Sequence, residues 1–269
     1  MKRLAVIGNP VAHSRSPEIH AAFAAQAGID ILYERLLAPV GDFARVARAF
    51  LDDGGCGFNI TVPFKHEAWA LAQSRSDAAD ASETVNTIKV LRDGSLYGDN
   101  TDGAGLVGDL ESNLRWPIDG AKVLVIGAGG AVAAVLPALL ARRPARLDLY
   151  NRTHERAARL ASRYPARVRA LETLADAGPY DLVVSGSSAG LSGSSPVLSP
   201  AIVGPRTRCY DMIYSATTTP FNAWAMESGA AVTSDGLGML VMQAASAFSL
   251  WFEFEPDTAP VIALLRRSI

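Results

Sequence analysis

An apolar run followed by a glycine-rich turn lies near the middle of the chain. Lys122–Ile126 has the composition of a buried strand, and Gly127–Ala131 leads into a stretch that is compatible with a helix. A strand, a glycine turn and a helix in this order are typical of a doubly wound parallel sheet. The Gly-x-Gly-x-x-Gly pattern is incomplete because position 132 is valine, so an ordinary turn between strand and helix also fits.

Strand and helix patterns alternate on both sides of this turn, which predicts an α/β fold with a parallel, doubly wound sheet in its second half. We divide the chain at 1–102, 103–236 and 237–269, and expect the last segment to be helical and to pack back on the first. Strands are expected at 4–7, 31–37, 57–62, 87–91, 95–98, 122–126, 146–150, 181–185, 209–213 and 230–233. Helices are expected at 43–51, 103–114 and 237–254, while 185–199 is a Ser/Gly-rich loop.

Local signals set several element ends. Ser16 suits the N-cap of a helix that has Pro17 at its first position and Gly28 after its end. Pro63 is expected to open a helix. Asp93-Gly94 between two alternating runs predicts a hairpin with a type I′ turn.

The composition excludes several classes of protein. The 269 residues are 49% hydrophobic and 19% charged, which indicates a packed globular protein, and the net charge of −2 gives no reason to expect nucleic acid. Two cysteines are too few for a disulfide framework, and we expect both thiols to be buried. The histidines and cysteines show no metal-ligand spacing. The apolar runs are too short for a signal peptide or a membrane span, so we expect no membrane partner and a cytoplasmic location.

The strand after the glycine turn indicates which dinucleotide would bind. Glycines let a backbone approach a pyrophosphate, and a helix N-terminus stabilises its charge. Asn151-Arg152-Thr153 follow the next strand, where an NAD site would carry Asp or Glu for the ribose hydroxyl. Arg152, with Thr153 and Arg156, suits a 2′-phosphate, which favours NADP.

Two short runs each place one ionisable side chain among hydroxyls and amides. Asn59–Lys65 provides Lys65, and Asp99–Gly103 provides Asp102. A lysine in the first turn of a helix opposes the macrodipole, so helix stability alone does not explain Lys65. Together with the nucleotide turn, these runs indicate a redox enzyme for a polyhydroxylated acid. Asp102 also suits a simple N-cap.

Further polar residues have both a functional and an ordinary explanation. Ser14 and Ser16 precede a helix and could hold a carboxylate, although Ser16 also suits an N-cap. Asn59 and Thr61 could satisfy backbone groups at a strand end, and Asn86 could belong to a turn. Gln243 could be a solvated helix position in an otherwise apolar stretch.

At these residues the chain closely resembles the shikimate dehydrogenase family, nearly from end to end. The matching segments are 8–17, 59–65, 85–87, 98–103, 127–131, 151–153, 211–214 and 235–240 with Gln243. The resemblance implies an N-terminal α/β substrate domain and a Rossmann-like NADP-binding domain. It also implies NADPH-linked reduction of 3-dehydroshikimate to shikimate, a step toward chorismate and the aromatic amino acids, by a monomer or homodimer.

The resemblance also implies roles for individual residues. Lys65 and Asp102 would form the catalytic pair. The substrate would be held by Ser14, Ser16, Asn59, Thr61, Lys65, Asn86, Asp102, Tyr214 and Gln243. The coenzyme would be held by Gly127, Ala128, Gly129, Gly130, Ala131, Asn151, Arg152, Thr153, Arg156, Met212, Gly236 and Met239.

Three segments depart from the family pattern. Glu83-Thr84 replaces a usual Gly-Ala pair, Ser185-Gly186-Ser187 replaces Asn-Ala-Thr, and Ser215-Ala216 replaces Asn-Pro. The alternatives are a quinate/shikimate dehydrogenase with broader substrate or NAD use, a dehydrogenase of a related acid, and a non-catalytic NADPH-binding sensor. The presence of both Lys65 and Asp102 disfavours the sensor.

Overall fold

The computed structural model describes residues 1–175, 177–187 and 198–269, which form two compact units. Unit 1 consists of Met1–Gly105 and Val241–Leu264, and unit 2 of Leu106–Leu240 and Leu265–Ile269. Most of the C-terminal segment, Val241–Leu264, therefore belongs to the first unit, whereas 237–240 and Leu265–Ile269 belong to the second. The predicted loop at 185–199 lies mostly outside the described residues.

Unit 1 contains a six-stranded mixed sheet in the order β2-β1-β3-β5-β6-β4. Its strands are β1 Lys2–Gly8, β2 Ile31–Leu37, β3 Gly55–Ile60, β4 Ser74–Arg75, β5 Thr87–Val90 and β6 Leu96–Asp99. Its helices are α1 Ser16–Ala27, α2 Phe43–Asp52, α3 Lys65–Leu71 and α4 Asp77–Ser82, with the first part of α5 Asp102–Gly108 and most of α9 Leu237–Phe252 and α10 Ala259–Ser268.

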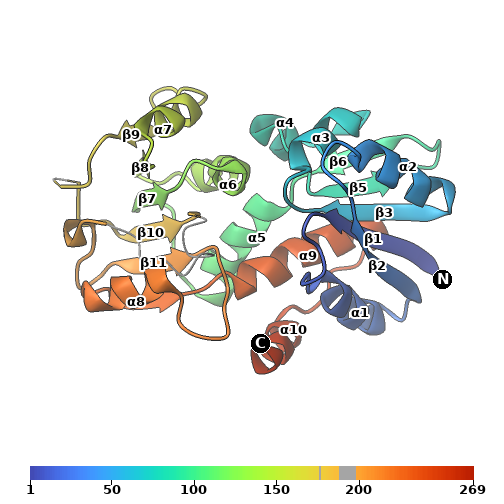
Figure 1. Ribbon diagram of the computed structural model, residues 1–269. Coiled ribbons are helices and arrows are strands. Elements are labelled where there is room, and N and C mark those ends of the chain that lie inside the picture. The colour runs from blue at the N-terminus through green and yellow to red at the C-terminus, as the bar shows by residue number, and fades with distance from the viewer. Residues whose placement is uncertain (176, 188–197) are drawn as a thin grey trace. The chain divides into compact units, whose positions relative to one another are not determined.

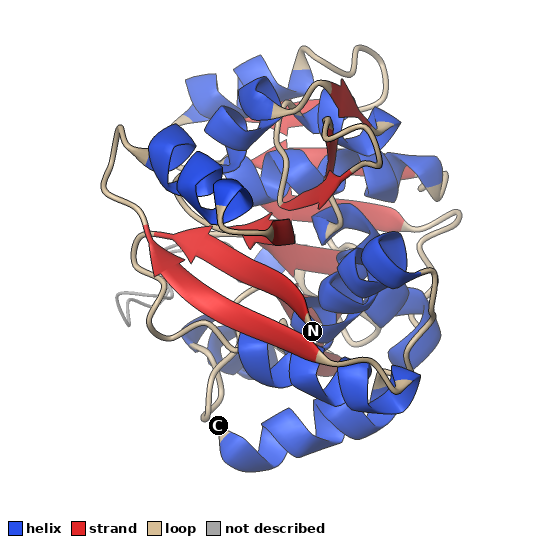
Figure 2. Cartoon of the chain, turned by 90° about the vertical axis from the view of Figure 1, so that its right-hand side faces the viewer, coloured by secondary structure: helices blue, strands red, loops and turns tan. Residues whose placement is uncertain are grey.

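Alternation along β1 explains why this sheet is covered on both faces. Ala5 and Ile7 pack with Phe43 and Phe50 of α2 in one apolar cluster, whereas Leu4 and Val6 are buried outside that cluster. Helices α2, α3 and α4 cover one face, and α1 and α9 cover the other (Figure 1). Figure 2 shows the twisted strands of this unit between the helices.

Unit 2 contains a six-stranded parallel sheet in the order β12-β11-β10-β7-β8-β9. Its strands are β7 Lys122–Ile126, β8 Arg146–Tyr150, β9 Arg169–Leu171, β10 Leu182–Ser185, β11 Arg208–Asp211 and β12 Val232–Ser234. Its helices include α6 Gly130–Ala141, α7 His154–Ala161 and α8 Pro220–Glu227. This strand order is that of the doubly wound dinucleotide-binding fold, so the predicted fold class is confirmed.

Several predicted element ends were wrong. Helix α1 begins at Ser16 itself, so the cap position falls on Arg15, and α3 begins at Lys65 because Pro63 lies in the preceding turn. Asp102 is the first residue of α5 rather than its N-cap. The predicted helix at 103–114 continues beyond α5 as a π-helix, Asp109–Asn113.

The hairpin between β5 and β6 exists, but its turn is not type I′. The N–H of Gly94 donates to the carbonyl of Leu91 at 3.0 Å, and Leu91 donates to Ser95 at 2.8 Å. Gly94 has φ +83°, whereas Asp93 is not among the residues with positive φ. This geometry is a type I turn followed by a left-handed glycine, because only one residue of the loop adopts the left-handed conformation.

The short strands β4 and β9 were not predicted, and β11 and β12 are shifted by one or two residues from the predicted ranges. Of the two cysteines, Cys209 is buried, as expected, and burial raises its pKa to about 12. Cys56 is only half-buried, so the expectation of two buried thiols was wrong for this residue.

Candidate active site

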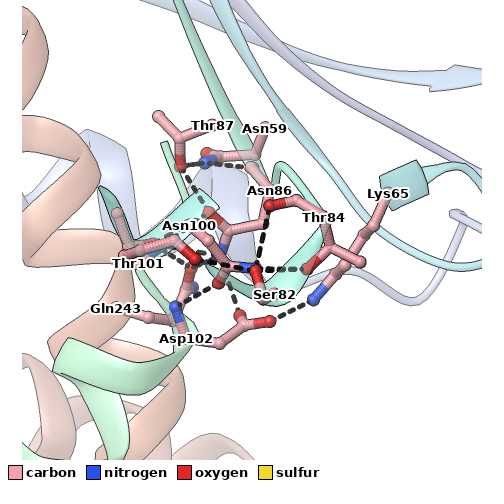
Figure 3. Close-up of polar contacts among 11 residues, drawn as sticks. Asn59, Lys65, Ser82, Thr84, Asn86, Thr87, Asn100, Thr101, Asp102 and Gln243 are labelled. Atoms are coloured by element: carbon pink, nitrogen blue, oxygen red, sulfur yellow. Dashed lines mark hydrogen bonds and ion pairs between the residues drawn. The ribbon is translucent and has the colours of Figure 1, made fainter. Parts of the chain in front are cut away.

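Lys65 and Asp102 meet in unit 1, although they are far apart in the sequence. Lys65 is the first residue of α3, and Asp102 is the first residue of α5. The Lys65 Nζ lies 2.5 Å from Asp102 Oδ2, and the two side chains are 20% and 10% exposed. Figure 3 shows the Lys65 ammonium approaching the Asp102 carboxylate from the right of the view, with Gln243 on the left. The pair is thus largely removed from solvent but not sealed.

Asn86 holds the other oxygen of this carboxylate. Its Nδ2 donates to Asp102 Oδ1 at 2.7 Å and to Thr101 Oγ1 at 3.0 Å. Its Oδ1 accepts from the Thr101 N–H at 2.9 Å. Asn86 is buried and therefore fixes the direction of Asp102, which is not the behaviour of a solvated turn residue.

Gln243 reaches the same cluster from α9. Its Oε1 lies 3.3 Å from Thr101 Oγ1 and 3.5 Å from Asn86 Nδ2. The residue is therefore directed toward the polar cluster of unit 1 (Figure 3) rather than being a solvated helix position.

Asn59 continues the cluster at the end of β3. Its Nδ2 donates to Thr87 Oγ1 at 3.0 Å and to the Asn86 carbonyl at 3.2 Å. Its Oδ1 accepts from the Tyr33 hydroxyl at 2.6 Å. Thr61 lies just beyond this strand, where its N–H donates to the Ile7 carbonyl.

Tyr33 and Asn100 belong to this network and were not singled out from the sequence. Tyr33 stacks on the ring of His20 with centroids 4.6 Å apart. His20 is fully buried, and desolvation lowers its pKa to about 3, so its ring is neutral. Asn100 accepts the Asp102 N–H on Oδ1 at 3.0 Å. Asn100 lies within the quoted run Asp99–Gly103, which was the available signal, whereas nothing in the sequence around Tyr33 marked it.

The two candidate carboxylate ligands lie at the start of α1. Ser14 Oγ and Ser16 Oγ are 3.1 Å apart, and the Ser16 N–H points to Ser14 Oγ at 3.3 Å. Because Ser16 is inside the helix and is not its cap, its hydroxyl is not committed to capping the first turn. The two hydroxyls therefore form an adjacent pair, and their role as carboxylate ligands stays a prediction.

The glycine turn of unit 2 combines a glycine of positive φ with open space at the start of α6. Gly127 has φ +112°, and Gly129 stands at the N-cap of α6. A Cβ added at Gly127 would lie 3.0 Å from the Gly186 carbonyl, whereas a Cβ at Gly129 or Gly130 would meet nothing within 4 Å. Gly127 thus serves the turn itself, and the open space at the other two glycines leaves backbone N–H groups accessible to a dinucleotide.

The other residues predicted to bind the coenzyme follow β8, β11 and β12, which belong to the same sheet as β7. Arg152, Thr153 and Arg156 are exposed after β8, and Asn151 Nδ2 donates to the Thr153 carbonyl at 2.8 Å. Met212 follows β11, and Gly236 packs so closely on its backbone that a Cβ there would lie 2.3 Å from the Met212 carbonyl oxygen. The donors present therefore fit an NADP molecule.

Comparisons with known proteins agree with this arrangement. The model of the shikimate dehydrogenase substrate binding domain matches residues 6–88, that of shikimate/quinate 5-dehydrogenase matches 110–193, and that of the shikimate 5′-dehydrogenase C-terminal domain matches 236–266. A shikimate dehydrogenase (NADP(+)) from Alkalilimnicola ehrlichii is 49% identical over 98% of both chains. The chain belongs to the shikimate dehydrogenase family.

Solved structures of related enzymes superimpose on this chain over nearly its whole length. An Ael1 enzyme from Pseudomonas putida superimposes with a TM-score of 0.92 at 38% identity, covering 98% of both chains. Shikimate 5-dehydrogenase from Thermus thermophilus, solved with NADP(H) and shikimate, gives a TM-score of 0.90 at 32% identity over the whole of both chains.

One departure from the family pattern places a side chain at a left-handed backbone position. Glu83 has φ +54° and ends α4 in the left-handed conformation, which glycine adopts without strain. The neighbouring Ser82 and Thr84 are buried, and Asn100 Nδ2 donates to Thr84 Oγ1 at 2.7 Å and to Ser82 Oγ at 3.3 Å. These hydroxyls therefore tie the departing segment to the residue that holds the Asp102 backbone (Figure 3).

Among residues 1–175, 177–187 and 198–269, no group of three His, Cys, Asp or Glu side chains is arranged to hold a metal ion. In the same described ranges, no helix combines the length and the apolar character needed to cross a bilayer.

Proposed function

We propose that this protein catalyses the NADPH-dependent, reversible reduction of 3-dehydroshikimate to shikimate. The observation that carries the proposal is the Lys65–Asp102 pair, fixed by Asn86, in a chain of the shikimate dehydrogenase family. When bound, NADPH supplies the hydride.

Lys65 and Asp102 would perform the proton transfer. Negative charge builds on the ring carbonyl oxygen during reduction, and an adjacent ammonium stabilises that charge and donates the proton. Asn86 holds Oδ1 of Asp102 and so fixes the direction of the carboxylate. The fixed carboxylate would then orient both the Lys65 ammonium and the ring hydroxyl of the substrate. In the oxidative direction the proton passes from the hydroxyl back to this pair.

The remaining roles follow the predicted division of labour. Residues 1–102 would bind the substrate, with Ser14 and Ser16 at its carboxylate. The substrate contacts proposed for the ring hydroxyls and their surroundings are Asn59, Thr61, Asn86, Tyr214 and Gln243. Residues 103–236 would bind NADP, and 237–269 would complete the first domain.

The coenzyme contacts rest on the glycine turn and the segment after β8. Gly127–Ala131 would hold the pyrophosphate, and Asn151, Arg152, Thr153 and Arg156 the 2′-phosphate. Met212, Gly236 and Met239 would lie near the nicotinamide. A cytoplasmic location and a monomeric or homodimeric assembly stay predictions, which cell fractionation and sedimentation would test.

An absorbance assay tests the proposal. Purified protein is mixed with shikimate and NADP⁺, and the appearance of reduced nicotinamide is followed; parallel samples contain NAD⁺, or quinate in place of shikimate. We expect fast turnover only in the sample that contains both shikimate and NADP⁺. Comparable turnover with quinate or NAD⁺ would instead assign a quinate/shikimate dehydrogenase. NADPH binding without turnover of either acid would favour a sensor or a dehydrogenase of another acid.

A further inference from the structure

A cavity lined by charged side chains lies in unit 2, at the opposite end of the strands from the glycine turn. Its volume is about 650 Å³, within the usual range for small-molecule sites. It is formed by residues 143–148, at the end of α6 and the start of β8, and by 166–169 before and at the start of β9, with Leu140. These are the amino-terminal ends of the strands, whereas the glycine turn follows the carboxyl end of β7.

Four arginines line this cavity, and its single acidic lining residue is Asp148. Asp148 is fully buried and accepts from Arg146 Nε at 2.6 Å, from Arg169 Nε at 3.0 Å and from the Tyr180 hydroxyl at 2.6 Å. One carboxylate therefore neutralises only one of the two guanidinium groups that it binds. The wall of the cavity retains positive charge.

The other two arginines add to this charge. Arg167 Nη2 donates to the Leu140 carbonyl near the end of α6, where it offsets the negative end of the helix dipole. Arg143 lies 3.4 Å from Asp119, which does not line the cavity. Even when Asp119 is counted, the cavity has an excess of two positive charges in a chain whose net charge is −2.

The geometry points to a binding site for a small polyanion of the phosphate-ester class. Guanidinium groups pair with phosphate oxygens bidentately, and several of them around one cavity suit a ligand with two or more negative charges. The site is separate from the one proposed for the dinucleotide. Arg146, which lines the cavity, is the first residue of β8, and Tyr150 is the last. Tyr150 directly precedes Asn151, where the segment proposed to bind the 2′-phosphate begins. An extended strand of this length spans about 13 Å between Arg146 and Tyr150.

Calorimetric titration with inorganic pyrophosphate tests this site. The protein is first saturated with NADP⁺, so that the glycine turn and Arg152 are not available to the probe. The test variant is Arg143→Gln/Arg167→Gln, which leaves the two arginines that neutralise buried Asp148. Arg206→Gln is the matched control, because Arg206 is exposed in the same unit but does not line the cavity. Thermal melting verifies that all variants fold.

We expect one pyrophosphate per chain, with a Kd that rises about tenfold or more in the double variant and stays near the wild-type value in Arg206→Gln. Absence of binding to the NADP⁺-saturated protein, or an unchanged Kd in the double variant, would overturn the site. Citrate is titrated in parallel: binding as tight as that of pyrophosphate would overturn the assignment to phosphate esters. The test needs no turnover, so its outcome is independent of the proposed dehydrogenase activity.

Discussion

In unit 1 the candidate substrate side chains are hydrogen-bonded to one another, whereas in unit 2 the predicted coenzyme ligands are the backbone of a glycine turn and exposed side chains after β8. Asn86 alone contacts Asp102, Thr101 and Thr87, and it is buried. Arg152 and Thr153 are exposed, and the space beside Gly129 is open. The comparison indicates that the acid–base site depends on positioned side chains, while the dinucleotide site depends on backbone N–H groups and on the absence of side chains.

Lys65→Ala should give the largest effect. Removal of the acid–base group should lower kcat by about two to four orders of magnitude. Folding should be retained because the Lys65 side chain is partly exposed and its ion pair joins it to Asp102, which Asn86 also holds. Steady-state kinetics and a melting curve check this. Lys122→Ala, at an exposed lysine, is the control. A near-normal kcat would remove Lys65 from the mechanism.

Asn86→Ala should show that the side-chain site also supports the fold of unit 1. The substitution leaves Asp102 Oδ1 and the buried Thr101 N–H without their partner, so unfolding free energy should fall by about 3 kcal/mol. Urea titration measures the change. If stability is unchanged, the network is not prearranged in the way that we describe.

Acid should lower the stability of unit 1 through His20, which stacks on Tyr33 beside the polar cluster. His20 has an ordinary pKa of 6.5 and a pKa of about 3 in the folded protein, because burial disfavours its charged form. Between pH 6.5 and about pH 3 the unfolded chain therefore binds a proton at His20 and the folded chain does not. The free energy of unfolding is highest above pH 6.5 and falls as the pH is lowered through this range. The loss is about 2 kcal/mol at pH 5. Urea titrations at pH 7 and pH 5 should show it, and His20→Phe should be less sensitive to pH; equal sensitivity would contradict this assignment.

Arg152→Gln tests the coenzyme site of unit 2. Loss of the guanidinium should raise KM for NADP⁺ about tenfold, leave KM for NAD⁺ unchanged, and leave stability unchanged because the side chain is exposed. Kinetics with both coenzymes and a melting curve provide the comparison. An equal effect on both coenzymes would argue against a 2′-phosphate contact.

Glu83→Gly should have the smallest effect, and of opposite sign. Glycine relieves the left-handed strain at φ +54° but gives the unfolded chain more freedom, so a net gain of roughly 0.5–1 kcal/mol is expected. Gly28→Ala is the matched control, because Gly28 has φ +65° with nothing within 4 Å of an added Cβ. That variant should lose stability. A loss in Glu83→Gly would mean that the Glu83 side chain itself stabilises the loop.

The sequence predicted the long buried strands well and the short ones poorly. The runs at 122–126 and 146–150 are strands with those bounds. The first is apolar from Val123 to Ile126, as in a strand covered on both faces, whereas the second alternates Leu147 and Leu149 with polar residues. Strands of two and three residues, such as β4 and β9, show no periodicity and owe their existence to their neighbours.

The site shows the same division between local and tertiary information. Lys65 was found because it opposes a helix dipole, and Asp102 because it lies in a polar run. Tyr33 could not be found in this way, because its role arises only when β2 and β3 place its hydroxyl beside Asn59. The functional roles of all these residues stay predictions until variants are measured.

The most direct test compares NADPH affinity in Lys65→Ala and Gly129→Ala by fluorescence titration. Gly129 has an extended backbone and open space, so alanine should fold there while its methyl group obstructs the dinucleotide. The account predicts a Kd within about twofold of wild type for Lys65→Ala and about tenfold or more higher for Gly129→Ala. Wild-type affinity in Gly129→Ala, or equal losses in both variants, would contradict the assignment of acid–base chemistry to side chains of unit 1 and of coenzyme binding to the backbone of unit 2.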